Sequence, residues 1–373
     1  MTRTIPQTDP GAAYFAQRTA IDAAIARVLA RGWYVLGEEV SGFEAEFAAY
    51  IGSRHAIGVG SGTDALVLAM KALGIGPGMR VATVSHTAVA TVSAIEMTGA
   101  EPLLLDIDAA SFTMDPEELE GALRQSPVPV AAVIAVHLFG QPADLDAIGG
   151  LTRRHGIPLI EDCAQCHGAR FDGQRAGSFG AAGCFSFYPT KQLGAIGDGG
   201  MVTTDDDSLA ASLRMLRQYG WNEARVSERP GINSRLDELQ AAILRVKLPL
   251  LDEDNRRRAA IAALYDQALL GLKLTLPARK PRSNHVFHQY VIGSPERDRL
   301  CQGLAARGIG TNIHYPVPVH LQPAYRGRLP LGPSGLPRTE QAAAEILSLP
   351  LYPQLDGEAV ALVTAAIREI LES

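Results

Sequence analysis

The chain has 373 residues, of which 47% are hydrophobic and 20% charged, and its formal net charge is −6. This length favours two domains with a large core, and the acidic balance with scattered basic residues excludes nucleic acid and anionic membranes as partners. Residues 1–10 contain no apolar signal core, and the longest apolar stretch, 128–138, is too short to span a bilayer. A cytoplasmic protein is expected.

The first half of the chain predicts a sheet covered by helices. After a helix at 19–31, apolar strands alternate with helical patterns from about residue 56 to 205, which is typical of a mostly parallel sheet with helices on both faces. One helix is predicted at 63–73, and another begins at Asp115-Pro116, where the missing proline N–H costs nothing. The seven predicted strands are 55–60, 80–84, 101–107, 130–137, 157–162, 183–187 and 200–204.

The pattern changes in the second half. After a loop at 225–233, Ser234 is a candidate N-cap for a helix whose apolar face includes Leu236 and Leu239. Beyond residue 250 the sequence predicts a strand at 286–292, a helix at 296–307 and a loop rich in Pro and His at 311–325. We therefore predict a large N-terminal domain over residues 1–248 and a small α+β domain over 249–373.

Two segments place reactive side chains just beyond predicted strands. Asp162 ends one strand, and Lys191 follows the aromatic run Phe185-Ser186-Phe187-Tyr188. Ligands of open α/β sheets bind at the carboxyl ends of the strands, so both groups are expected near one pocket. A lysine forms a Schiff base with a carbonyl, and a carboxylate keeps a pyridinium nitrogen protonated. An ion pair at Asp162 and a solvated loop lysine remain the structural alternatives.

Ser61-Gly62-Thr63 lies between a predicted strand and a predicted helix. Free N–H groups and the positive dipole end of a helix attract anions, so this segment is a candidate phosphate site. A plain N-cap at Thr63 explains the same residues. Ser186 stands in an otherwise apolar strand and is a candidate for the same pocket.

The segment Cys163-Ala164-Gln165-Cys166-His167 matches the C-x-x-C-H pattern of covalent haem attachment and half of a zinc or redox site. The sequence contains neither an export signal nor a second C-x-x-C. We therefore interpret these cysteines as packing residues and predict no metal site.

Several motifs in the same order resemble the DegT/DnrJ/EryC1/StrS family of pyridoxal 5'-phosphate (PLP)-dependent aminotransferases that act on nucleotide-linked keto sugars. The resemblance runs nearly end to end, and its strongest segments are 32–37, 62–66, 161–169, 185–191, 197–200, 232–242, 314–316 and 320–325. It implies an α/β fold of fold type I, with a large domain built on a mostly parallel seven-stranded sheet and a smaller C-terminal α+β domain.

The resemblance also implies roles for individual residues. Lys191 would bind PLP covalently and later carry a proton, and Asp162 would pair with the pyridine nitrogen. His86 would stack on the ring, although a core histidine is its alternative, and Asn233 would reach the neighbouring subunit's phosphate in a homodimer with shared sites. The full set of implied cofactor-binding residues is Gly62, Thr63, His86, Asp162, Gln165, Ser186, Lys191 and Asn233.

The implied reaction moves an amino group from L-glutamate to a nucleotide-linked keto-deoxysugar. The loop around His314-Tyr315-Pro316 resembles members that aminate C-3 of a dTDP-3-keto-6-deoxyhexose. Candidate substrate-binding residues are Tyr188, His314, Tyr315 and His320. The structural alternative for each is a Pro-flanked loop residue that only packs the loop. The alternatives are a C-4 aminotransferase of the same family, a PLP-binding regulatory protein, and another fold-type I enzyme such as a desulfurase.

Overall fold

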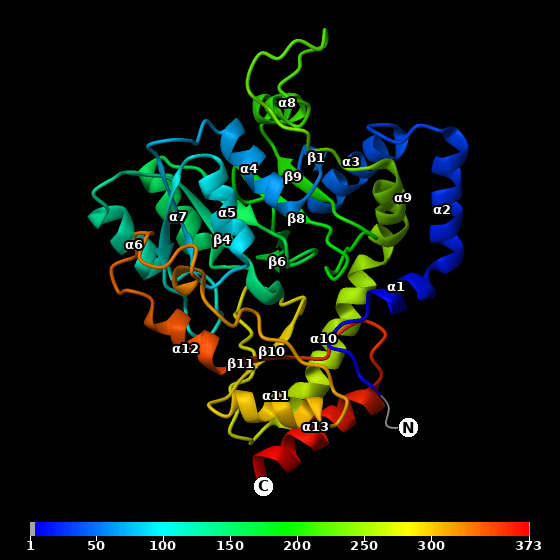
Figure 1. The fold of residues 1–373 in the computed structure, drawn as a ribbon, viewed down its shortest axis with the longest axis vertical. Coiled ribbons are helices and arrows are strands. Elements are labelled where there is room, and N and C mark those ends of the chain that lie inside the picture. Colours follow the sequence, from blue (N-terminus) through cyan, green and yellow to red (C-terminus); the bar gives the residue numbers. More distant parts are fainter. Residues whose placement is uncertain (1–3, 373) are drawn as a thin grey trace.

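The computed structural model describes residues 4–372 and is built around one seven-stranded sheet (Figure 1). The strand order is β1-β9-β8-β5-β4-β2-β3, and only β9 runs antiparallel to its neighbours. The predicted mostly parallel sheet of seven strands is therefore confirmed. The strands are β1 (His55–Val59), β2 (Arg80–Val84), β3 (Glu101–Leu105), β4 (Val130–Val136), β5 (Leu159–Asp162), β8 (Ala182–Ser186) and β9 (Gly200–Thr204).

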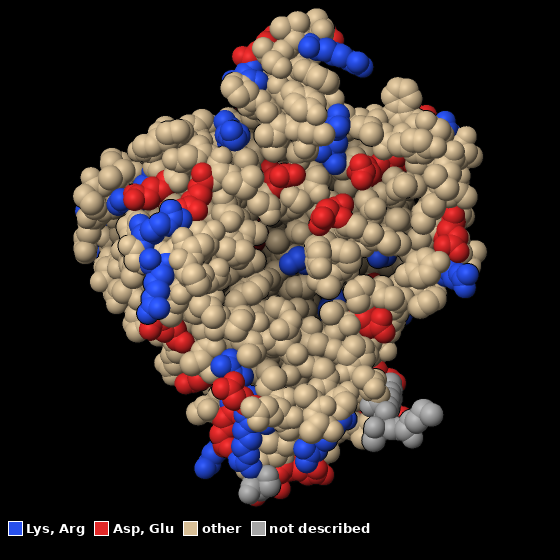
Figure 2. Space-filling view, viewed as in Figure 1, with Lys and Arg blue, Asp and Glu red and all other residues tan. Residues whose placement is uncertain are grey.

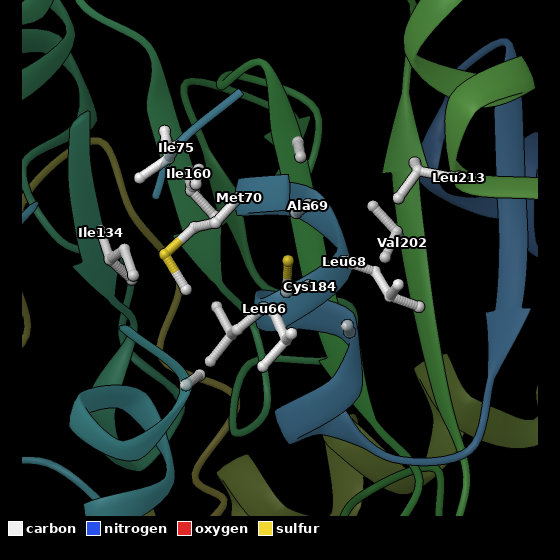
Figure 3. Packing of buried hydrophobic residues seen from close by; sticks show 14 of the residues in the cluster. Leu66, Leu68, Ala69, Met70, Ile75, Ile134, Ile160, Cys184, Val202 and Leu213 are labelled. Atoms are coloured by element: carbon white, nitrogen blue, oxygen red, sulfur yellow. The ribbon is translucent and has the colours of Figure 1, made fainter. Parts of the chain in front are cut away.

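Helices cover the sheet because their apolar stripes match its buried strands. Leu66, Leu68 and Met70 of α4 (Gly62–Ala72) pack against side chains from several strands, including Ile160 and Val202 (Figure 3). Burying a side chain of this size contributes about 1.5–3 kcal/mol. The other helices of this region are α5 (Val89–Met97), α6 (Pro116–Gln125), α7 (Leu145–His155) and α8 (Asp207–Leu216). As predicted, α6 begins at Asp115-Pro116, and the Asp115 carboxylate accepts the Glu117 N–H.

The N-terminal helices pack beside a helix from the middle of the chain. They are α1 (Pro10–Ala16), α2 (Arg18–Arg31) and α3 (Glu38–Ile51), and both α2 and α3 contact α9 (Glu238–Lys247). The prediction that Ser234 caps this helix is wrong, because α9 begins after Asp237. Ser234 instead accepts the Gly60 N–H at 2.9 Å and donates to Asp64 Oδ2 at 2.7 Å. It thereby fastens the loop between β1 and α4.

The C-terminal part has a core of its own below the sheet (Figure 1). Its strands β10 (Tyr290–Gly293) and β11 (Ile346–Leu349) pair antiparallel, so the strand predicted from residue 286 begins four residues later than expected. Ile5 packs into the same cluster, which ties the N-terminal segment to this part. A domain boundary at residue 248 stays a prediction. The helices are α10 (Leu251–Leu269), α11 (Arg297–Ala305), α12 (Pro337–Glu345) and α13 (Gly357–Glu372).

Short elements complete the description: β6 (Arg170–Phe171), β7 (Gln174–Arg175) and the 3₁₀ turns η1 (Leu138–Gly140), η2 (Leu248–Leu250) and η3 (Val319–Leu321). Within residues 4–372, no helix is both long and apolar enough to cross a membrane.

Candidate active site

A hollow lies in the middle of the face shown in Figure 2, with Lys and Arg atoms visible at its edge. The carboxyl ends of β5 and β8 and the loops after them place Asp162 and Lys191 close enough to interact electrostatically. A pocket adjoins Lys191 and is also lined by Lys247, Arg258 and Gln354. The two reactive groups predicted from separate segments thus lie in one region of the molecule.

Asp162 is a buried carboxylate with a fixed donor on each oxygen. Its side chain accepts the Ala164 N–H on Oδ1 at 3.1 Å and the Thr91 hydroxyl on Oδ2 at 2.9 Å. Burial raises the pKa of Asp162, while these hydrogen bonds and the charge of Lys191 act in the opposite direction. A buried carboxylate that is fixed by these donors is suited to pair with a cation.

Lys191 is a partly buried amine at the end of a tight turn. Its backbone N–H donates to the Tyr188 carbonyl at 2.9 Å, and a side chain at Gly194 would approach the Pro189 carbonyl oxygen to 2.5 Å. Burial lowers the pKa of Lys191 to about 8, against the opposing effect of the Asp162 charge. More of the amine is therefore neutral near pH 7 than for an exposed lysine, and the neutral amine is the form that attacks a carbonyl.

The start of α4 forms a cradle against the end of β8. Ser61, not Thr63, is the N-cap, because its Oγ accepts the Asp64 N–H at 3.1 Å. A Cβ on Gly62 would lie 2.6 Å from the Ser186 Cβ, so only glycine allows this approach. The cradle brings together Gly62, Thr63 and Ser186, and helix starts of this kind bind phosphate through free N–H groups.

Gln165 joins the sheet to the C-terminal part. Its amide oxygen accepts the Phe139 N–H at 2.8 Å, and its amide nitrogen donates to the Tyr315 hydroxyl at 3.1 Å. Burial raises the pKa of Tyr315 to about 12, and the Asp162 charge adds to the shift. The structure therefore brings Tyr315, Gln165 and Asp162 together as neighbours.

The predicted histidines have different surroundings. His86 is 1% exposed, both of its ring nitrogens have no partner in the described part of the chain, and burial lowers its pKa to about 4. His314 Nδ1 lies 2.8 Å from the Ser348 hydroxyl, and burial lowers its pKa to about 4 as well. His320 is enclosed between Ser85 Oγ at 2.8 Å and Glu340 Oε1 at 3.1 Å, so both of its nitrogens are engaged.

Two predicted residues lie at the surface. The side chain of Tyr188 is 52% exposed, and Asn233 is exposed where it pairs with Gln218. Gln218 and Asn233 close the base of a hairpin that follows α8 and projects at the top of Figure 1. Neither residue is brought against Asp162 by this single chain.

The cysteine motif directly follows Asp162 in the chain, and both of its cysteines are buried. One ligand atom from each of His137, Cys163 and Cys166 lies within 4.8 Å of the others, and burial raises the pKa of both thiols. Both nitrogens of His137 already have partners, Ala143 N at 3.0 Å and Glu161 Oε2 at 3.1 Å. The ring nitrogens of His137 are therefore already engaged, and the absence of a metal site stays a prediction.

Glu161 faces away from Asp162 because consecutive strand residues alternate between the faces of a sheet. Its carboxylate is fully buried and accepts the N–H groups of Gly177, Phe179 and Gly180 at 2.7–2.9 Å. Glu161→Gln would place an amide NH₂ group, which donates hydrogen bonds, against backbone N–H groups that also donate. We therefore expect urea denaturation to show a loss of roughly 3 kcal/mol in unfolding free energy. Glu120→Gln is the matched control, since its contacts with Arg124 and Arg154 are exposed. Equal stability of the two variants would contradict this account of Glu161.

Sequence reasoning missed Thr91, whose hydroxyl contacts Asp162 directly. It lies in the helix α5, where Val92 and Ile95 are also buried. The sequence of α5 also contains Ser93 and Glu96, so nothing in it distinguished Thr91 or pointed to its partner.

Comparisons with known proteins identify the family. The DegT/DnrJ/EryC1/StrS aminotransferase family matches residues 16–368. The dTDP-3-amino-3,4,6-trideoxy-alpha-D-glucose transaminase of Streptomyces venezuelae is 48% identical over 373 residues, which is 100% of this chain and 97% of that protein. The erythromycin biosynthesis sensory transduction protein EryC1 of Saccharopolyspora erythraea is 47% identical over 98% of this chain and 99% of its own length.

Solved structures agree with these matches. The crystal structure of S. venezuelae DesV in complex with a ketimine intermediate has a TM-score of 0.96 at 48% identity, with 100% of both chains covered. The structure of ntda from Bacillus subtilis with bound cofactor PMP has a TM-score of 0.87 at 28% identity, covering 96% of this chain and 82% of that one. The sheet, the matched segments and these likenesses agree, and the chain belongs to the DegT/DnrJ/EryC1/StrS aminotransferase family.

Proposed function

We propose that this protein uses PLP to transfer an amino group from L-glutamate to C-3 of a dTDP-linked 3-keto-6-deoxyhexose. The observation that carries the proposal is the placement of the buried Asp162 carboxylate and the partly buried Lys191 amine close enough for their charges to interact, in an aminotransferase fold. A ring nitrogen and a carbonyl at opposite ends of one cofactor suit these two groups.

The residues present fit PLP in three respects. The Gly62–Ser186 cradle at the start of α4 suits its phosphate. His86 is a flat, neutral ring whose two buried nitrogens have no partner in the described part of the chain, so it suits stacking on an aromatic ligand. Asp162 suits the pyridine nitrogen. When bound, PLP supplies a conjugated ring that takes up the electron pair left behind when the amino carbon loses its proton.

The protein's own groups then have distinct tasks. The Asp162 carboxylate holds a proton on the ring nitrogen and thereby maintains the electron demand of the ring. The Lys191 amine, whose pKa is lowered to about 8, would take the proton from the amino carbon of the donor and deliver it to the cofactor carbon on the other side of the shared nitrogen. Gln165, fixed by Phe139 and Tyr315, orients the ring through its hydroxyl side.

L-Glutamate as the donor is supported by the charge beside Lys191. Arg258 is 5% exposed and bonds the carbonyl oxygens of Phe287 and Leu351 at 3.4 and 3.3 Å. Its Nε has no hydrogen-bond partner in the described part of the chain, although the charge of Asp254 acts on this buried cation. Buried charges need partners, and a donor with two carboxylates supplies one.

A homodimer with shared sites is supported by exposed apolar side chains in two parts of the chain. Trp33 is 64% exposed and Val226 in the hairpin is 59% exposed, so both are available to pack against a second subunit. Asn233 at the base of the hairpin is then available to reach a phosphate held by the neighbouring subunit.

The choice of C-3 and of dTDP rests on relatives. The S. venezuelae transaminase, named for a dTDP-3-amino sugar, matches the whole chain at 48% identity. A regulatory role is the second candidate, because the relative at 47% identity is named a sensory transduction protein.

Spectroscopy of the purified protein separates these candidates. We expect L-glutamate to remove the absorbance of bound PLP and a dTDP-3-keto-6-deoxyhexose to restore it, while a 4-keto isomer restores it at least tenfold more slowly. D-Glutamate is the control for the donor. No spectral change with L-glutamate would contradict the aminotransferase proposal and favour the regulatory one, and faster recovery with the 4-keto sugar would contradict C-3 amination.

A further inference from the structure

Thr91 is a buried polar residue of α5 beside the carboxylate of the site. Its side chain is 0% exposed, and its Oγ1 lies 2.9 Å from Asp162 Oδ2 and 2.9 Å from Thr87 Oγ1. The other oxygen of Asp162 accepts the Ala164 N–H. Both oxygens of the carboxylate therefore have one donor each, and one of these donors is a side chain that substitution can remove.

The direction of the hydroxyl chain follows from the charge of Asp162. An ionised carboxylate only accepts hydrogen bonds, so Thr91 donates to Asp162. The single hydroxyl proton of Thr91 is then used, and Thr91 accepts from Thr87. Both hydroxyl dipoles point their positive ends toward the carboxylate, and hydrogen bonds to a charged form stabilise that form.

Burial acts against this charge. Burial raises the pKa of Asp162, whereas the bonds from Ala164 and Thr91 and the charge of Lys191 lower it. The hydrogen bonds thus offset part of the cost of burying the charge of the carboxylate. They also fix the rotation of the carboxyl group, which determines where the remaining lone pairs point.

We propose that Thr91, supported by Thr87, is a positioning residue that keeps Asp162 ionised and turned toward the ring nitrogen of the cofactor. This inference rests on the proposed function and deepens it. Thr91 itself touches neither substrate nor cofactor in this account and acts through Asp162.

Other titratable groups also surround Asp162, and substitution at Thr91 leaves them unchanged. The charges of Lys191 and His137 lower the pKa of Asp162, and the charge of Asp162 raises the pKa of the Tyr315 phenol. The charge of Asp162 also raises the pKa of three buried thiols, those of Cys163, Cys166 and Cys184. A changed titration in a Thr91 variant therefore reports on the lost hydroxyl.

The test compares Thr91→Val, Thr91→Ser and Thr83→Val in the full-length protein. Thr83 is an equally buried threonine in β2 whose hydroxyl donates to the Ile134 carbonyl at 3.1 Å, away from Asp162. We expect Thr91→Val to weaken PLP binding to the apoprotein about tenfold and to slow the half-reaction with L-glutamate about tenfold, as for a lost bond to a charge. The pH midpoint of the bound-PLP absorbance should shift as well. Thr91→Ser should restore all three values, and Thr83→Val should leave them unchanged.

Each other result would overturn the inference. A structural role alone would lower the melting temperature of Thr83→Val and Thr91→Val alike and leave the pH midpoint in place. If Thr91→Val does not fold, Thr87→Val replaces it in the test, and we expect this variant to bind PLP two- to threefold more weakly than wild type. PLP binding as tight as that of wild type would then contradict the inference. A wild-type protein that ignores L-glutamate would refute the proposed function, whereas a responsive wild type with an equally responsive Thr91→Val refutes only the role of Thr91.

Discussion

Replacing Lys191 with alanine is expected to reduce amino transfer by at least about 10⁴-fold, because the same amine both attacks the cofactor carbonyl and moves the proton. Stopped-flow absorbance with saturating L-glutamate measures this loss. The variant should remain folded. Lys191 is charged less readily in the folded state, where its pKa is about 8, than in the unfolded chain. Its removal below pH 8 therefore relieves a burial cost, and the apoprotein should melt no earlier than wild type.

Lys247→Ala is the matched control for this experiment. Lys247 lines the same pocket, its Nζ donates to the Gly194 carbonyl at 2.6 Å, and burial lowers its pKa too. We expect this variant to keep activity within a few-fold of wild type. Substantial turnover in Lys191→Ala, or a loss in Lys247→Ala that matches it, would contradict the assignment of the reactive amine.

Asp162→Asn is expected to slow the half-reaction with L-glutamate about 10²- to 10³-fold, the size of effect seen when a preorganised electrostatic partner is removed. Asparagine has nearly the same shape and still accepts the Thr91 hydroxyl, but it has no charge with which to hold a proton on the ring nitrogen. Single-turnover kinetics isolate this step from the binding of the sugar.

Asp106→Asn controls for the loss of a buried carboxylate. Asp106 is 1% exposed and accepts the N–H groups of Arg338 and Thr339 at the start of α12. That variant should lose stability in urea but keep its rate with L-glutamate within a few-fold. A normal rate in Asp162→Asn would contradict the role of this carboxylate.

The strands and the two reactive groups could be predicted because each depends on a short stretch of sequence. Residues 157–162 and 183–187 are mostly apolar runs, which predicts buried strands. A buried strand that ends in Asp162 places this carboxylate at the carboxyl ends of the strands. The cradle was also predictable, because a Gly between a strand and a helix allows close approach. The Gly62–Ser186 contact shows why that residue is glycine.

What could not be predicted depends on contacts between distant segments. Ser234 has the residue type of an N-cap, yet its hydroxyl serves Gly60 and Asp64, about 170 residues earlier. His320 and Ser85 are 235 residues apart, so their hydrogen bond has no trace in either local pattern. Thr91 and Asp162 are 71 residues apart, so their hydrogen bond was not predictable either. Side-chain partners of this kind are set by topology, which local propensity does not encode.

The most direct test of the central claim is the identity of the lysine that holds PLP. Sodium borohydride converts lysine-bound PLP into a stable secondary amine, and peptide mass spectrometry then locates the modified residue. The chain has five lysines, at positions 71, 191, 247, 273 and 280, so the result is unambiguous. We predict one modified site, Lys191, and no modification after prior incubation with L-glutamate. Modification at Lys247, or none at Lys191, would contradict the site described here.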